Sequence, residues 1–322
     1  MTEPNVNPEY DKSYYAVVDL GSNSFHLAIS QLTDHQHLKI TNRVKEKVRL
    51  AAGLTAENLL TDEAIERGLI RLHNFARHLA TIPSENIIIV ATAALRIARN
   101  NDEFINKANI ILPKKIQLLT GEQEASTIYA GVVYTDPKVL TVSTEAITRL
   151  VLDIGGASTE IVVGEGAITK NLVSLNIGCV SYIHQHFADG LLSEHNFKQC
   201  IAAASSQIAS VSKAFKALNW QSVLGRSGTM QAMVEILSFQ KRPSLITLPF
   251  LYEIKATLVT CKTLNDISID GMRCDRAGVL ASGLCILIAL FNELNIKEMQ
   301  LSTGALREGL LSQLLPNAHF TN

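Results

Sequence analysis

A stretch that occurs twice constrains the fold of this 322-residue chain more than any other feature. Residues 151–164, VLDIGGASTEIVVG, share the layout of residues 15–30, YAVVDLGSNSFHLAIS. The matched pairs, each 134 positions apart (153 minus 19), are Asp19 and Asp153, Gly21 and Gly155, and Ser24 and Ser158. An internal repeat of this kind is first of all a signature of architecture. It predicts two similar units in separate halves of the chain.

Each copy of the repeat predicts a β-hairpin whose turn is rich in Gly, Ser and Thr. In the second copy, Asp153 ends an apolar strand and Ile161–Val163 form the returning strand. A carboxylate at the end of a buried strand is costly unless it binds something cationic. The adjacent glycines let backbone N–H groups approach an anion. A capping Asp in an ordinary tight hairpin would explain either copy alone, but two copies favour a turn that holds a metal-bound phosphate.

Composition excludes several classes of protein. The chain is 47% hydrophobic and 18% charged, which is typical of a globular protein with a sizeable core. Its formal charge of −1 argues against a dedicated nucleic-acid-binding protein. The sequence predicts no apolar segment long enough to span a membrane. The five cysteines form no CxxC pair, so reduced thiols and a cytoplasmic location are expected.

The predicted organisation is a flexible leader over residues 1–14 and lobes at 15–133 and 134–322. The leader is polar, contains two prolines and has no apolar signal core. In the first lobe, Arg43, Lys45, Lys47 and Arg49 alternate with other residues, so a strand would place all four on one face. A charged edge strand and a basic wall that guides a polyanion are both compatible with this pattern.

Two further positions stand where α/β proteins bind ligands. Arg96 lies near the start of a helix that follows the buried strand 86–91, a position suited to an anion, although a surface Arg is the simpler interpretation. Glu122 and Glu124 occupy the first turn of a helix that follows the strand 116–119. Such carboxylates often only complement the helix dipole, but the carboxyl ends of strands are also the usual ligand crevice.

A set of eight segments, in order along the chain, resembles the exopolyphosphatase and guanosine pentaphosphate phosphohydrolase (Ppx/GppA) family. The segments are VVDLGSNSFHL at 17–27, VRLAAGL at 48–54, ATAALR at 91–96, TGEQEA at 120–125, LDIGGASTE at 152–160, GCVSY at 178–182, SGT at 227–229 and STGALREG at 302–309. The resemblance covers about residues 15 to 315. It implies an α/β fold with two ribonuclease H-like lobes, as in the actin, Hsp70 and sugar-kinase superfamily, and an interlobe cleft. It also implies that the final helix, about residues 304–315, packs back on the first lobe. Many members continue into a further helical region, so the resemblance is to a short two-domain form.

The resemblance also implies roles for individual residues. Members of the family cut a terminal phosphoanhydride with Mg²⁺ and water, and Glu124 matches the general base. Asp153 and Glu160 match the metal and water positions. The residues that match the first phosphate loop are Asp19, Gly21, Ser22, Asn23 and Ser24. Those that match the second are Gly155, Gly156, Ala157, Ser158 and Thr159. The arginines expected to bind phosphate are Arg96 and Arg276.

The expected activity is therefore release of phosphate from guanosine pentaphosphate (pppGpp), from inorganic polyphosphate, or from both. Ala157 and the segment VRLAAGL are similar to the guanosine pentaphosphate branch of the family. The alternatives are a sugar or acetate kinase of the same superfamily and a non-catalytic sensor of guanosine tetra- or pentaphosphate. Neither nucleic acid nor a membrane is expected as a partner, and a homodimer is left open.

Overall fold

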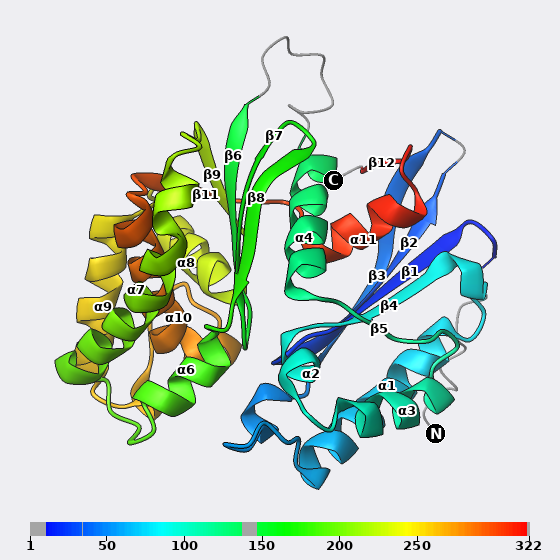
Figure 1. Ribbon diagram of the computed structural model, residues 1–322, viewed down its shortest axis with the longest axis horizontal. Coiled ribbons are helices and arrows are strands. Elements are labelled where there is room, and N and C mark those ends of the chain that lie inside the picture. The colour runs from blue at the N-terminus through cyan, green and yellow to red at the C-terminus, as the bar shows by residue number, and fades with distance from the viewer. Residues whose placement is uncertain (1–10, 34, 137–146, 321–322) are drawn as a thin grey trace. The chain divides into compact units, whose positions relative to one another are not determined.

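The computed structural model describes residues 11–33, 35–136 and 147–320 as two compact units (Figure 1). Unit 1 consists of residues 1–120 together with 306–322, and unit 2 consists of residues 121–305. The expected boundary between the lobes lies at residue 134, whereas the chain passes from unit 1 to unit 2 after residue 120. The chain returns to unit 1 after residue 305, and the final helix packs against β1, in line with the expectation that this helix packs back on the first lobe. Residues 1–10 of the expected leader lie outside the described residues, and the first strand already begins at Tyr14.

Unit 1 is built on a six-stranded sheet of order β12-β3-β2-β1-β4-β5. β1, β2 and β3 form an antiparallel meander, and β4 and β5 continue in parallel from β1. The strands are β1 Tyr14–Leu20, β2 Ser24–Leu32, β3 His37–Lys47, β4 Ile87–Ala91, β5 Gln117–Leu118 and β12 His319–Phe320. The helices are α1 Asp62–Leu79, α2 Ala93–Ile97, α3 Asn101–Ile111 and α11 Leu306–Leu314.

Unit 2 repeats this plan with the order β10-β11-β9-β6-β7-β8. Its strands are β6 Thr148–Ile154, β7 Thr159–Glu165, β8 Ile168–Leu175, β9 Ser222–Gly225, β10 Ile246–Thr247 and β11 Glu298–Leu301. Its helices are α4 Gly121–Thr135, α6 Cys179–His186, α7 Glu194–Lys216, α8 Gly228–Phe239, α9 Leu248–Cys261 and α10 Ala277–Leu294. α4 lies on one face of the sheet and α6 to α10 lie on the other (Figure 1).

Apart from β12 and β10, the two sheets have the same strand order and the same directions. In each, three antiparallel strands are followed by two parallel ones, which is the ribonuclease H-like arrangement. The repeated segments form the first hairpin of each unit, β1–β2 and β6–β7. The predicted fold class is therefore confirmed.

The basic segment of unit 1 differs in part from its prediction. Arg43, Lys45 and Lys47 occupy exposed alternate positions of β3, while the intervening Glu46 accepts a hydrogen bond from Asn74 Nδ2 of α1 at 2.9 Å. Arg49 lies beyond the end of the strand, with a φ of 56°, so it does not share that face. Strand alternation ends where the backbone leaves the sheet, and the basic face therefore has three members.

Helix α10 forms the core of unit 2. A segment from Cys274 to Leu294 is long and apolar enough to cross a membrane by length and composition, contrary to the expectation from the sequence, but 72% of its most apolar window is buried inside the protein. This is the burial expected of a core helix that packs against α6 and α7. Gly283 allows the closest approach, because a Cβ there would overlap the side chain of Thr229 in α8.

Two glycines of α10 provide a matched test of this packing. We expect Gly283→Ala to lower the free energy of unfolding by about 1–3 kcal/mol, because the added methyl meets Thr229 in a filled core. Gly278→Ala, in the first turn of the same helix, meets nothing within 4 Å and should be neutral or stabilising by about 0.5 kcal/mol. Urea denaturation of both variants measures the difference. Equal effects would show that Gly283 is not a contact point.

Candidate active site

The hairpin β6–β7 places two acids directly opposite each other. Asp153 of β6 pairs with Glu160 of β7, and Ser174 of β8 pairs with Glu160 on its other side. Residues directly opposite one another in a sheet project from the same face. All three side chains therefore lie on one face of unit 2.

That face is the one covered by α4. Arg149 has the same parity on β6 as Asp153, and its guanidinium pairs at 3.1 Å with Asp136, just after the end of α4. Gly164 has the same parity on β7 as Glu160, and a Cβ there would overlap the ring of Tyr129 from α4. The α4 helix thus lies over the acids of the hairpin.

Glu124 reaches this group of acids from α4 and is only 7% exposed. The helix is held in place along its length. Tyr129 donates a hydrogen bond to the Gly166 carbonyl at 2.9 Å, and Thr303 contacts Thr135 through its hydroxyl at 3.1 Å. These contacts fix the position of Glu124 relative to the β6–β7 hairpin.

Glu160 is the most deeply buried of the three acids, with 2% of its surface exposed. Its pKa is raised well above the usual range, mainly because burial removes water from the carboxylate and then because the charges of Glu124 and Asp153 repel it. A hydrogen bond from Ser174 Oγ to Oε1, at 2.7 Å, opposes this shift. A carboxyl group in this setting takes up a proton readily, which is the behaviour expected at a site that handles protons.

The turn of the β6–β7 hairpin accepts backbone hydrogen bonds from α6. The N–H of Cys179 donates to the Gly155 carbonyl at 3.0 Å, and the N–H of Val180 donates to the Gly156 carbonyl at 2.8 Å. The loop is closed by a hydrogen bond from the N–H of Gly155 to the Ser158 carbonyl at 2.8 Å. Backbone N–H groups of α6 therefore bind the carbonyl oxygens of the loop, and these bonds fix the shape of the loop backbone.

The side chains of this second loop are mostly structural. The Thr159 hydroxyl donates to the Ile177 carbonyl at 2.7 Å, and Ala157, Ser158 and Thr159 are all buried. Within the described residues, the N–H groups of Gly156 and Ala157 donate to no protein acceptor. The donors that the loop can offer to an anion are thus backbone N–H groups, as in other phosphate-binding nests.

The first loop, in unit 1, is tied down in a different way. The Ser22 hydroxyl accepts a hydrogen bond from the N–H of Ala94 at 3.1 Å, so it caps the start of α2. The Asn23 carbonyl accepts from the N–H groups of Val48 and Arg49 at 3.1 and 2.8 Å. The Ser22 side chain therefore has a structural task, and the part of this loop suited to an anion is again the backbone.

The two predicted phosphate-binding arginines have different surroundings. Arg96 is half-buried and donates to the Leu119 carbonyl at 3.1 Å, where β5 ends. Arg276 is fully engaged with α8, since its guanidinium forms two hydrogen bonds to Glu235, at 3.1 and 3.0 Å, and one to the Gly228 carbonyl at 2.9 Å. These contacts make Arg276 a structural link between the start of α10 and α8, and they argue against a phosphate-binding role.

The carboxylates suit a hard divalent cation such as Mg²⁺, because all of their donor atoms are oxygen. Among the described residues, no group of three or more His, Cys, Asp or Glu side chains is arranged to hold a metal ion by itself. Mg²⁺ is usually held by one or two carboxylates with substrate phosphates and water. Asp153, half-buried at the end of β6, and Glu160 opposite it fit that partial set.

Sequence reasoning missed two residues of functional interest. Ser174 binds Glu160, but nothing local in SLNIG indicates this contact. His26 lies opposite Asp19 in the β1–β2 hairpin, as Glu160 lies opposite Asp153 in the second copy. The 134-residue offset, which carries position 26 onto 160, was the signal that could have found it.

Two ribonuclease H-like units, each with a Gly/Ser-rich hairpin turn, define the fold class of this protein, and unit 2 adds a buried group of acids. The sequence places the chain within that class. Residues 28–318 match the model of the Ppx/GppA phosphatase family, and the chain belongs to this family.

Two curated relatives carry the name guanosine-5'-triphosphate,3'-diphosphate pyrophosphatase. That of Pseudoalteromonas atlantica is 45% identical over 317 residues, which is 98% of this chain and 61% of the relative. That of Aeromonas hydrophila is 45% identical over 310 residues, which is 96% of this chain and 61% of the relative. The chain thus spans about 61% of the length of these relatives.

Solved structures share the fold. An exopolyphosphatase from Cytophaga hutchinsonii superposes with a TM-score of 0.80 at 23% identity, covering 95% of this chain and 98% of that one. The PPX-GPPA enzyme of Aquifex aeolicus superposes with a TM-score of 0.70 at 23% identity, covering 93% and 99%. At this level of identity the two structures establish the fold.

The raised pKa of Glu160 predicts a pH dependence of stability. Because its folded pKa lies above its unfolded pKa, Glu160 contributes stability at low pH that is lost as pH rises through the folded pKa. Glu160→Gln has no such loss, so we expect it to unfold at higher urea concentration than the wild type near pH 7. The advantage should vanish below about pH 4, where even an unfolded Glu is protonated.

Urea denaturation between about pH 4 and pH 8, in the presence of a chelator, measures this difference. The control is Glu122→Gln, which changes an exposed acid of α4, the helix that also carries Glu124. Its midpoint should follow that of the wild type at every pH. If the urea midpoint of Glu160→Gln exceeded that of the wild type by the same amount at every pH, burial of charge would not be the cause of the difference.

Proposed function

We propose that this chain hydrolyses a terminal phosphoanhydride and releases phosphate from guanosine pentaphosphate, with polyphosphate as a second substrate. The observation that carries the proposal is the group of three acids, Glu124, Asp153 and Glu160, beside a loop whose backbone N–H groups are free to bind an anion. Acids suit the activation of water and the binding of a metal, and the loop suits the phosphate. The names of the two curated relatives support the choice of substrate.

In this proposal the phosphate chain is bound by backbone N–H groups. Gly156 and Ala157 of unit 2 donate to the phosphoryl group that is cut, and the loop at residues 21–24 of unit 1 is a second candidate for binding phosphate. Arg96 adds a cation near the end of β5. Fixed donors around the transferred phosphoryl are the main means by which enzymes accelerate this reaction.

Glu124 is proposed to accept the proton of the attacking water. It is well placed for this task because α4 is held rigidly over the β6–β7 hairpin. Its neighbour Glu160, whose pKa is raised, is suited to share or relay that proton. Asp153 and Glu160 would hold Mg²⁺, which supplies positive charge to neutralise the phosphate oxygens.

A cytoplasmic location is part of the proposal. All five cysteines are free thiols, and Cys179, Cys200 and Cys285 are buried. Free thiols are usual where glutathione keeps the surroundings reducing. The substrates proposed here are also charged metabolites that do not cross membranes unaided.

Removal of the Glu124 carboxylate tests the proposed activity. We expect Glu124→Gln to keep the fold and the KM for guanosine pentaphosphate but to lower kcat by about 10²–10⁴-fold, because the amide accepts no proton. The matched control is Glu122→Gln, two residues earlier and exposed, which should turn over at the wild-type rate. Release of inorganic phosphate in Mg²⁺ buffer measures both. Wild-type turnover by Glu124→Gln would exclude Glu124 as the base.

We infer that a short substrate is preferred over a long one. Processive degradation of a polyanion needs an extended basic track. The candidate track on unit 1 has three exposed bases, Arg43, Lys45 and Lys47, within five residues of one strand. Guanosine pentaphosphate needs only the phosphate loops and space for a nucleoside.

We therefore expect a higher kcat/KM for guanosine pentaphosphate than for long polyphosphate, and distributive cleavage of polyphosphate. Gel electrophoresis of polyphosphate, partly digested under substrate excess, should show chains of intermediate length. Short polyphosphate should be cut more efficiently than long polyphosphate in the same assay. Disappearance of full-length chains without intermediates, together with slower cleavage of guanosine pentaphosphate, would contradict this preference.

A further inference from the structure

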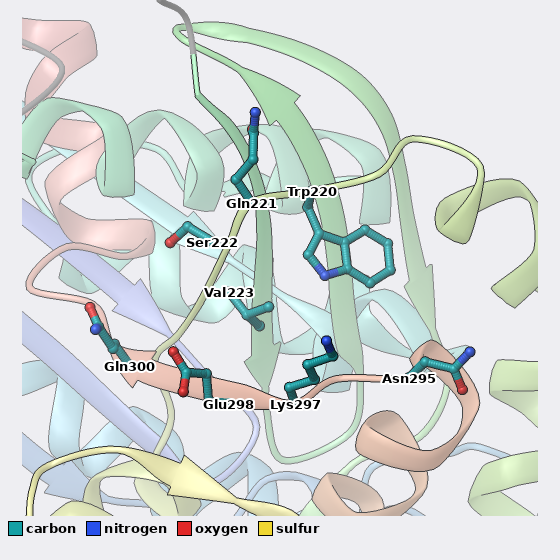
Figure 2. A pocket seen from close by; sticks show the side chains of 8 residues that line it. All are labelled: Trp220, Gln221, Ser222, Val223, Asn295, Lys297, Glu298 and Gln300. Carbon is teal, nitrogen blue, oxygen red and sulfur yellow. The ribbon is translucent and has the colours of Figure 1, made fainter.

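A cavity of about 580 Å³ lies in unit 2 at the amino ends of the parallel strands β9 and β11 (Figure 2). The acids of the candidate active site project from the carboxyl-terminal half of β6, which runs parallel to β9. The cavity and the acids therefore lie at opposite ends of the parallel strands of the same sheet. Its volume is in the range of small-molecule sites.

Trp220 supplies an aromatic face to this cavity. It is the single tryptophan of the chain, it is only partly buried, and its indole projects into the space above Lys297 (Figure 2). An aromatic ring left outside a core is a platform on which a planar base can stack, and such stacking adds substantially to affinity.

The backbone around Trp220 is fixed before any ligand arrives. Asn219 takes a left-handed conformation, with a φ of 47°. Gln221 is bound to Thr148 twice: its N–H donates to the Thr148 carbonyl at 2.9 Å, and its side-chain oxygen accepts from the Thr148 N–H at 2.6 Å. A preorganised platform loses little entropy when it binds.

The rest of the lining is polar and of mixed charge. Lys297 and Glu298 follow each other at the start of β11, both exposed, and neither forms an ion pair within the part of the chain that the structure describes. Figure 2 shows the ammonium group of Lys297 directed toward the indole of Trp220. An apolar ligand would remove water from these charges without pairing them, and a polyanion would be repelled by Glu298. A neutral planar ring with polar edges fits both features.

We propose that this cavity binds a guanine nucleoside, with the base stacked on Trp220 and Lys297 donating to O6 and N7 of the base. A Lys is a common partner of these two guanine acceptors. Adenine presents an N6 amino donor in place of O6, so the same Lys discriminates against it. The proposal needs no phosphate group, and it is independent of the phosphoanhydride chemistry proposed for the other end of the parallel strands.

Fluorescence of the single tryptophan reports on this site directly. Titration with guanosine should quench Trp220 in a saturable manner, and adenosine should bind about tenfold or more weakly. Lys297→Met, which keeps most of the length of the side chain and removes its donors, should lose about tenfold in affinity for guanosine and leave the affinity for adenosine unchanged. Lys216→Met, in the last turn of α7, is the matched control and should bind guanosine like the wild type.

Calorimetry of Trp220→Ala separates stacking from edge recognition. Both nucleosides should lose affinity by a similar factor in this variant, because stacking does not depend on the base. Circular dichroism confirms that the variant is folded. Guanosine carries no phosphoanhydride, so Glu124→Gln should bind it as the wild type does, whatever the outcome for hydrolysis.

Three results would overturn the proposal. The first is the absence of saturable quenching up to the solubility limit of guanosine. The second is equal affinity of the wild type and Lys297→Met for guanosine. The third is loss of the guanosine signal when inorganic pyrophosphate is added, because that would place the ligand at the phosphate loops.

Discussion

The arrangement of unit 2 depends on a carboxylate that is held out of water beside two others. Glu160 is almost fully buried, and the charges of Glu124 and Asp153 act on it. In a folded protein such a group is destabilising in its charged form, and side-chain hydrogen bonds from Ser158 and Ser174 compensate for only part of the loss of water. The surrounding structure must therefore hold the acids together against their mutual repulsion.

That restraint comes from packing on both faces of the sheet. On one face, Tyr129 lies against Gly164, where no larger residue would fit, and this contact holds α4 over the hairpin. On the other face, the Ser282 hydroxyl of α10 donates to the Cys179 carbonyl at 2.6 Å, and Cys179 in turn donates to the loop carbonyl of Gly155. A continuous set of contacts thus runs from the apolar core helix to the loop of the β6–β7 hairpin. A loop held in one shape in this way meets the condition for electrostatic preorganisation.

The sequence predicted those features that depend on local pattern. The repeat indicated two hairpins, and the hairpin register then follows from the four-residue turn, which brings Asp153 opposite Glu160. Features that depend on distant partners were not predictable. Nothing in the local sequence around Arg276, DGMRCDR at residues 270–276, indicates that its side chain pairs with Glu235, which lies 41 residues earlier. The division of the chain after residue 120 also depends on distant partners, because α4 joins unit 2 through packing on β7 and β8, which follow it in the chain.

The two hairpins keep one geometry but have opposite electrostatic surroundings. In unit 2 the position opposite Asp153 is Glu160, and the neighbouring charges are negative. In unit 1 the position opposite Asp19 is His26, whose pKa is lowered to about 3 by burial and by the positive charges of Arg307 and Lys45. His26 is therefore neutral at physiological pH, and the cations beside it lie near a loop suited to anions. The two copies thus share one hairpin backbone, while the residues at the same strand position, His26 in unit 1 and Glu160 in unit 2, lie among charges of opposite sign.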